Sequence, residues 1–398
     1  MRVLVSAWAW PSHYLPLVPT LQALRAAGHD VLVASQPRLG ETVRRSGLPF
    51  AACGADVDHE ALRRRQMSGL THADVPPAPP PGQSAKVWTA DEWLRVSKVF
   101  SVFAARSELM LDDLAGVARA YRPDLVLFEP TTYAGPLVAA LLGVPAVRHL
   151  HGVDLTYQAR EVVPALIAPL AARLGLGAVD PLGDHTLDPC PPSMQIPTHV
   201  TRTVQRYVPY NGPAAVPPWL IGEPRRPRVC LTWGATTSSL GGGFAPPTVL
   251  DALSGERLEI VVAVTAADRE RLGPQPAHVR VVESLALHLV LPSCAALIHQ
   301  GGFGSTLTAA ALGVPQLVLP QLVDQTFQAA RLRATGSAAV LTAAETDGPA
   351  IGERVRALLD DPAYADAAAA LRAEIAAVPA PADVVPDLEM LALTSRRQ

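Results

Sequence analysis

The segment HQGGFGSTLTAAALGVPQLVLPQLVDQ, which spans His299–Gln325, is the part of the chain from which the fold is inferred. Its glycine-rich start precedes a predicted helix that begins at residues 304–306, runs through Thr308–Leu312 and ends at Gly313. The apolar run Val314–Leu319 then predicts a buried strand. A glycine turn, a helix and a buried strand in this order are typical of an α/β fold.

The same segment has the features of a phosphate-binding site. Glycines let a ligand approach the backbone closely, and the start of a helix adds N–H donors and the positive end of a dipole. Ser305 and Thr306 are expected to cap this helix. A tight turn whose glycines serve packing alone is the alternative. The expected donor-binding residues are His299, Gly301, Gly302, Gly304, Ser305, Thr306, Asp324 and Gln325.

Within this set, three side chains have separate expected tasks. We expect His299 to donate a hydrogen bond to a phosphate oxygen. Asp324 and Gln325, in a loop beyond the buried strand, are expected to bind the hydroxyls of a sugar.

The order of these residues resembles the nucleotide-sugar signature of the family 1 glycosyltransferases, above all of the bacterial antibiotic (macrolide) type. That signature is His-His-Gly-Gly-x-Gly-Thr, then Gly-Val-Pro-Gln, then a Pro and Asp-Gln. Here Gln300 replaces the second His and Ser305 replaces the Thr. The resemblance implies the α/β GT-B fold, with two Rossmann-like domains whose parallel sheets face a central cleft. It also implies phosphate contacts from Thr236 and Thr237 and a backbone contact from Leu285 to a pyrimidine ring.

Length and composition fit this architecture. The chain has 398 residues, enough for two α/β domains, and 49% hydrophobic residues allow a large core. A net charge of −3 argues against nucleic acid as the main partner. Since no uninterrupted apolar run reaches about 18 residues, we expect no membrane span. A homodimer is compatible with the sequence.

The chain is expected to divide at a proline-rich segment. Residues 1–208 are predicted to form an acceptor-binding Rossmann-like domain, because strand, loop, helix and strand follow one another at its start. Residues 209–227 contain many prolines and predict a linker. Residues 228–377 would form the donor domain, and residues 378–398 would pack back on the first domain, as the resemblance implies.

His13 is the candidate general base. It lies in the first strand-to-helix loop, at the edge of the sheet where open α/β proteins bind ligands, and an imidazole can take up a proton at neutral pH. Glu129 ends another strand at this edge and would stabilise the imidazolium. The resembled family carries a His in this loop and usually an Asp at the position of Glu129. A solvent-exposed loop histidine and a plain strand-end charge are the alternatives.

The loop around His13 is aromatic, which suits a large flat or macrocyclic aglycone. Trp8, Trp10 and Tyr14 are therefore expected to bind the acceptor. His149 and His151 form an H-x-H pair after a predicted strand, but no third ligand has suitable spacing. His149 is expected to line the pocket or to be structural.

We expect neither a metal nor a cofactor. The paired aspartates at 112–113 and 360–361 are typical of solvated helix faces, and a helix start can take the place of a cation at the phosphates. The four cysteines form no CxxC pair, which indicates reduced thiols in the cytoplasm.

Together these features predict an inverting glycosyltransferase. The resemblance implies a TDP-deoxysugar as donor and a hydrophobic natural product, such as a polyketide, as acceptor. A nucleotide-sugar epimerase, which needs no acceptor pocket, and a non-catalytic partner of another transferase are the competing hypotheses.

Overall fold

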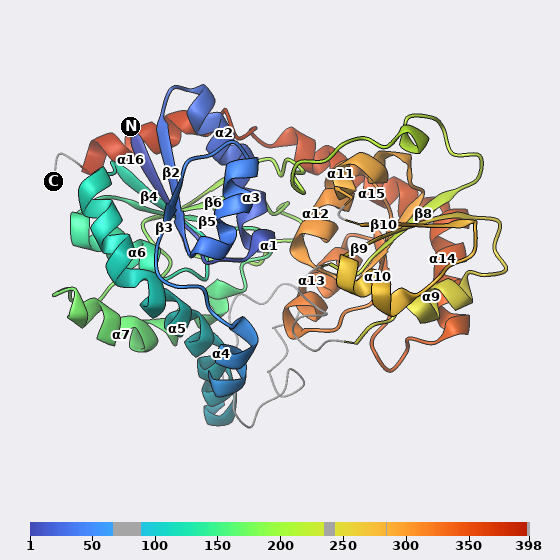
Figure 1. Cartoon of the computed structure of the whole chain (residues 1–398), viewed down its shortest axis with the longest axis horizontal. Coiled ribbons are helices and arrows are strands. Elements are labelled where there is room, and N and C mark those ends of the chain that lie inside the picture. The colour runs from blue at the N-terminus through green and yellow to red at the C-terminus, as the bar shows by residue number, and fades with distance from the viewer. Residues whose placement is uncertain (67–88, 235–242, 284, 396–398) are drawn as a thin grey trace. The chain divides into compact units, whose positions relative to one another are not determined.

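The computed structural model describes residues 1–66, 89–234, 243–283 and 285–395. The chain forms two compact units (Figure 1). Unit 1 comprises Met1–Cys190, Ile196–Arg206 and Pro379–Gln398, and unit 2 comprises Pro191–Gln195 and Tyr207–Val378. Residues 209–227, expected as a linker, therefore belong to unit 2.

Unit 1 is built around a seven-stranded parallel sheet. Its strands are β1 (Arg2–Ser6), β2 (Asp30–Ser35), β3 (Phe50–Ala52), β4 (Leu125–Phe128), β5 (Ala146–His149), β6 (His185–Asp188) and β7 (Arg202–Val204). Their order is β3-β2-β1-β4-β5-β6-β7. The central strands β1 and β4 are almost continuously apolar and buried, as expected for a parallel sheet with both faces covered. The order reverses between β1 and β4, and ligands of such sheets bind at this point.

Helices connect and cover these strands. They are α1 (Pro11–Tyr14), α2 (Val18–Ala26), α3 (Gly40–Arg45), α4 (His59–Gln66), α5 (Ala90–Tyr121), α6 (Ala134–Leu142), α7 (Val163–Arg173) and α16 (Val385–Ser395). A capping box of Thr89 and Glu92 starts α5. Residues of α5, α6 and α7 pack against β1, β2 and β4 in one core.

Unit 2 contains a six-stranded parallel sheet. Its strands are β8 (Arg228–Thr232), β9 (Glu259–Val264), β10 (Val279–Glu283), β11 (Ala296–His299), β12 (Gln316–Val318) and β13 (Ala338–Val340). Their order is β10-β9-β8-β11-β12-β13, which reverses between β8 and β11. Val229 and Leu231 of β8 lie in one core and Cys230 lies in another, so both faces of the sheet are buried.

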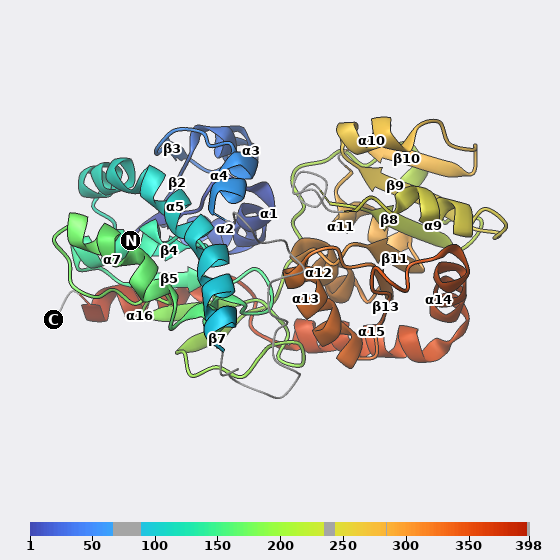
Figure 2. The same cartoon turned by 90° about the horizontal axis from the view of Figure 1, so that it is seen from below.

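Helices cover both faces of this sheet as well. They are α9 (Pro246–Ala252), α10 (Ala266–Leu272), α11 (Leu287–Val290), α12 (Phe303–Leu312), α13 (Val323–Ala334), α14 (Gly348–Asp360) and α15 (Pro362–Ala377). Helices α9 and α14 share one core with the sheet, and α11 and α12 share the other. Figure 2 shows α9 and α14 together on one side of unit 2 and α12 on the other.

The two units repeat one local device. Helices α6 and α12 each end at a glycine in the left-handed region, Gly143 with φ 65° and Gly313 with φ 72°. In both cases a Val-Pro pair and a buried strand follow, because the helix cannot continue past such a residue. The described helices include none with the length and apolar character that a membrane crossing requires.

Candidate active site

Two segments of unit 1 meet where its strand order reverses. Ser6, the last residue of β1, pairs with Phe128, the last residue of β4. His13 follows β1 on the short helix α1, which Pro11 starts, and Glu129 directly follows β4. His13 thus lies in a helical turn rather than in an open loop, at the edge of the sheet that the sequence predicts.

The structure brings His13 and Glu129 into direct contact. Nδ1 of His13 lies 2.7 Å from Oε1 of Glu129, whose side chain is fully buried, while that of His13 is 20% exposed. The hydroxyls of Thr131 and Thr132 also donate to the carboxylate, each at 2.8 Å. Burial alone raises the pKa of Glu129, but the facing His13 outweighs it and brings this pKa to about 2. The carboxylate therefore stays ionised and can stabilise a protonated imidazole.

A second histidine stands beside this pair. The ring centroids of His13 and His151 are 4.5 Å apart, and Nδ1 of His151 lies 3.9 Å from the same oxygen of Glu129. Burial, together with the neighbouring His13, lowers the pKa of His151 to about 3, so its ring is neutral at pH 7. The three residues offer ligand atoms within 4.8 Å of one another, a combination that Zn²⁺ also binds.

Two of the four expected acceptor-binding residues lie beside His13. The ring centroid of Trp8 is 5.0 Å from that of Trp10 and 5.0 Å from that of His13. The indole N–H of Trp8 donates to Thr131 at 2.9 Å, which fixes the ring against the segment that holds Glu129. Trp8 is buried and Trp10 is half-buried. The two indoles therefore form an aromatic pair next to the candidate base, of which Trp10 is the partly exposed member.

The other two side chains expected to bind the acceptor, Tyr14 and His149, are fully buried within unit 1. The Tyr14 hydroxyl lies 2.6 Å from that of Ser46, at the end of α3. His149 is the last residue of β5 rather than part of a loop, and its Nδ1 lies 2.7 Å from the carbonyl oxygen of Leu150. Its Nε2 lies 2.9 Å from Thr20 Oγ1. Burial lowers the pKa of His149 to about 4, so it is a neutral structural residue.

Unit 2 carries its glycine-rich turn at the equivalent point of its own sheet. Thr232, which ends β8, pairs with His299, which ends β11. Gly302 is the N-cap residue of α12, and no described side chain caps this helix. The backbone amides at such an uncapped helix start are donors for an anion.

His299 supports this turn from within the protein. It is fully buried, and burial lowers its pKa to about 4. Its Nδ1 accepts the N–H of Gly301 at 3.1 Å, and its Nε2 lies 3.0 Å from Oε1 of Gln316. Because Gln316 takes the remaining ring N–H, the expected donation from His299 to a phosphate is not available in this arrangement. His299 instead positions Gly301.

The three glycines at 301, 302 and 304 differ in how far the fold requires them. Gly301 has φ 91°, and a Cβ there would lie 3.0 Å from Val318 Cγ1, so the fold itself requires glycine. A Cβ at Gly302 would lie 3.0 Å from Nε2 of Gln300. At Gly304 a Cβ would meet nothing within 4 Å, so the protein does not need a glycine there.

Four polar residues of this region lie in helices rather than at the expected cap and loop positions. Ser305 and Thr306 are inside α12, since Gly302 takes the cap position. Asp324 and Gln325 are in the first turn of α13. Oε1 of Gln325 accepts the N–H groups of Gln321 at 2.9 Å and Leu322 at 3.1 Å, so it holds the start of α13.

Of the three further residues expected to contact the donor, the structure describes Leu285 only. Leu285 is half-buried before α11 and packs against the core that includes α11 and α12. Thr236 and Thr237 lie outside the described residues.

Sequence reasoning missed three residues of the unit 1 site. Thr131 and Thr132 hold Glu129, and His151 contacts His13. The Glu-Pro-Thr-Thr run at 129–132, directly after a buried strand, is a signal that could have indicated the first two. His151 was recognised only as half of an H-x-H pair, because its proximity to His13 depends on the pairing of β4 with β5.

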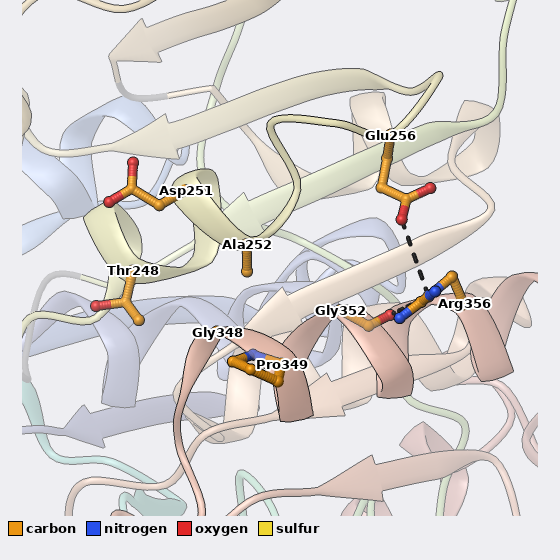
Figure 3. A pocket seen from close by; sticks show the side chains of 8 residues that line it. All are labelled: Thr248, Asp251, Ala252, Glu256, Gly348, Pro349, Gly352 and Arg356. Carbon is orange, nitrogen blue, oxygen red and sulfur yellow. Dashed lines mark hydrogen bonds and ion pairs between the residues drawn. The ribbon is translucent and has the colours of Figure 1, made fainter.

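A separate hollow of 430 Å³ lies in unit 2 between α9 and α14 (Figure 3). Figure 3 shows Arg356 of α14 turned toward Glu256, with Nε 3.9 Å from the carboxylate. Nε of Arg356 also donates to the carbonyl of Gly352 at 3.2 Å. None of the residues predicted for catalysis or binding lines this hollow.

Comparison with known proteins identifies the family. Residues 22–234 match the N-terminal domain, and residues 247–391 the C-terminal domain, of the model "Erythromycin biosynthesis protein CIII-like". The chain belongs to this family.

Its relatives are glycosyltransferases of antibiotic biosynthesis. The chain is 37% identical to the 10-deoxymethynolide desosaminyltransferase of Streptomyces venezuelae, covering 100% of this chain and 98% of the relative. It is 36% identical to the TDP-daunosamine transferase DnrS of Streptomyces peucetius, again with 100% and 98% covered. The chain is therefore a glycosyltransferase.

The solved structures confirm the fold. The glycosyltransferase VinC in complex with DTDP matches with a TM-score of 0.83 and 31% identity, covering 99% of this chain and 100% of VinC. The GT-B architecture predicted from the sequence is thus confirmed.

Proposed function

We propose that this protein transfers a deoxysugar from a TDP-sugar to a hydrophobic polyketide aglycone with inversion at the anomeric carbon, and that His13 is the general base. The observation that carries this proposal is the 2.7 Å contact between His13 and the buried Glu129. A base needs a partner that stabilises its protonated form, and an ionised carboxylate facing the ring supplies it.

The chemistry follows from this geometry. Because Nδ1 of His13 faces Glu129, Nε2 takes the proton of an acceptor hydroxyl. The acceptor oxygen forms a bond to the anomeric carbon while the bond from that carbon to the diphosphate breaks, and TDP leaves with the electron pair. A single displacement of this kind inverts the anomeric configuration. The backbone amides at the start of α12 stabilise the charge that develops on the diphosphate.

The substrate classes are supported by the relatives. DnrS is a TDP-daunosamine transferase, and VinC was solved with DTDP, which favours TDP as the nucleotide. The S. venezuelae relative glycosylates 10-deoxymethynolide. The indoles of Trp8 and Trp10 beside His13 suit such an apolar acceptor.

The test is incubation of the purified protein with a panel of TDP-sugars and polyketide aglycones, followed by mass spectrometry. The expected result is an aglycone heavier by one sugar residue together with free TDP. Conversion of the TDP-sugar without any aglycone would support the epimerase instead. Binding of TDP without turnover of any pair would support the non-catalytic partner.

We also propose that transfer needs no metal. The α12 start carries the diphosphate contact, and the Glu129 carboxylate is already satisfied by His13, Thr131 and Thr132. Transfer should therefore be unchanged after dialysis against EDTA, and a loss that Mg²⁺ restores would contradict this. The described cysteines are free thiols, which is compatible with action in the cytoplasm.

A further inference from the structure

Unit 1 contains a buried cation that the proposed reaction does not use. Arg106 lies in the long helix α5 and is 5% exposed. Its guanidinium carbon is 4.0 Å from the ring centroid of Trp8 and 5.4 Å from that of Phe103. Its Nε is enclosed without a hydrogen-bond partner among the described residues.

This arrangement is costly for the protein. A guanidinium has five N–H donors and stays charged, yet within the described part of the chain Arg106 contacts two aromatic rings rather than a carboxylate. Burial lowers the pKa of Arg106 to about 10, although the nearby Glu129 opposes this shift. Stacking on aromatic rings compensates only part of the lost hydration. A buried charge whose Nε has no hydrogen-bond partner in the described residues is more typical of a functional site than of a structural core.

The position of Arg106 relates it to the candidate base. The guanidinium carbon of Arg106 lies 4.0 Å from the ring centroid of Trp8, and the ring centroids of Trp8 and His13 are 5.0 Å apart. The indole N–H of Trp8 is held by Thr131, whose hydroxyl also donates to Glu129. Glu129 itself accepts from His13, Thr131 and Thr132, and no hydrogen bond joins it to Arg106 in the described part of the chain.

We propose that Arg106 binds a carbonyl or ionised oxygen of the acceptor and thereby fixes which hydroxyl of the aglycone reaches His13. This inference rests on the proposed function, because it assigns an acceptor to the aromatic surface of Trp8 and Trp10. Apolar contacts alone do not fix the orientation of a large ring system, because they are not directional. Two N–H donors held in one plane are sufficient to orient the aglycone relative to His13. The acceptor class is accordingly an aglycone with a ketone, a phenolate or a carboxylate at a fixed distance from the glycosylated hydroxyl.

The experiment compares the wild type with Arg106→Met and Arg106→Gln. The probes are a polyketide aglycone that carries a ring ketone and the same aglycone with that ketone reduced to a methylene group, which cannot accept a hydrogen bond. Tryptophan fluorescence quenching gives the dissociation constant of each, and steady-state kinetics give KM and kcat where transfer is detected. For the ketone we expect Arg106→Met to raise the dissociation constant and KM about tenfold or more, because a charge-assisted hydrogen bond is lost. The reduced aglycone should bind the wild type and Arg106→Met alike.

Controls separate this role from a purely structural one. Arg119→Gln, on the exposed end of the same helix, should change nothing. Arg106→Met should keep its melting temperature, since replacing a buried charge by an apolar side chain of similar length is often neutral. Affinity for TDP should also be unchanged in both Arg106 variants. Should Arg106→Met unfold, Arg106→Gln, which keeps part of the donor set, provides the same comparison.

Two outcomes would overturn the inference. One is an equal loss of affinity for the ketone and for its reduced form. The other is an unchanged affinity for both. If the pH dependence of kcat then shifts, Arg106 acts on Glu129 and not on the acceptor. Absence of transfer to any aglycone would refute the proposed function, whereas the binding measurement would still decide the role of Arg106.

Discussion

The candidate sites of the two units lie at the same topological point of their sheets, but they consist of different chemical groups. In unit 1 the site follows β1 and β4, and in unit 2 it follows β8 and β11, where each strand order reverses. Unit 1 gathers ionisable side chains there, with the Glu129 carboxylate against the ring of His13. In unit 2 the available groups are the backbone N–H groups of a glycine turn and of an uncapped helix start. The buried, neutral His299 supports this turn.

This difference fits the division of roles that we propose, with proton transfer in unit 1 and diphosphate binding in unit 2. Moving a proton needs a side chain that changes its charge, and a carboxylate held ionised by its surroundings makes that change favourable. Holding a diphosphate needs fixed donors that do not change, which backbone amides and a helix dipole supply without a titrating group. Substitutions that act on one property and leave the other intact test the division directly.

The largest effect is expected from His13→Ala. Removal of the general base should lower kcat about a thousandfold, within the usual range for such a group. Affinity for TDP, measured by calorimetry, should be unchanged because we propose that the diphosphate binds at the α12 start in unit 2. The exposed His199 of unit 1 provides a matched control, and His199→Gln should retain full activity. Near-normal turnover in His13→Ala would remove His13 as the base.

Glu129→Gln should have the next largest effect. The amide oxygen can still accept from Nδ1 of His13, so the ring keeps its orientation, but the charge that stabilises the imidazolium is lost. We expect kcat to fall about a hundredfold at most and the acceptor KM to change little. A fall in kcat as large as that of His13→Ala would show that orientation and charge are not separable here.

The unit 1 site was largely predictable from the sequence, and the reason is topological. A residue that follows a buried parallel strand lies at a known edge of the sheet, so His13 and Glu129 could be placed near each other without coordinates. Tyr14 and His149 could not be placed correctly, because a shift of one residue along a helix or strand turns a side chain from a surface into a core. The contact of Arg106 with Trp8 could not be predicted, since the rotation of the long helix α5 relative to Trp8 depends on tertiary packing.

The unit 2 site was predictable in its backbone and less so in its side chains. The strand, the glycine turn and the end of α12 at Gly313 follow from local rules. The task of His299 depends on Gln316, a residue of the neighbouring strand β12, and that contact requires the strand order. The cap of α13 by Gln325 likewise requires the conformation of Leu322, which no local pattern indicated.

Gly304→Ala tests whether the backbone of α12 itself binds the nucleotide. Because a Cβ at Gly304 meets nothing in the protein, and alanine favours a helix, the melting temperature should stay the same or rise. If the diphosphate approaches this turn closely, the added methyl group should weaken TDP binding about tenfold. Gly301→Ala is the contrasting variant, since its φ of 91° and the close Val318 predict a loss of both stability and binding. Unchanged TDP affinity in Gly304→Ala would place the diphosphate elsewhere.

The smallest effect concerns acid stability and distinguishes structural from catalytic histidines. Burial lowers the pKa of His149 to about 4, below the ordinary value of 6.5. Between these two values the unfolded chain binds more protons at this residue than the folded chain does, so stability is present near pH 7 and is lost as the pH falls toward 4. Each such histidine contributes a slope of at most about 1.4 kcal/mol per pH unit. In His149→Gln the melting temperature should therefore depend less steeply on pH between 6.5 and 4. An unaltered slope in His149→Gln would mean that the protein accommodates a charge at this position, and the side chain would then have to be reconsidered as part of the acceptor site.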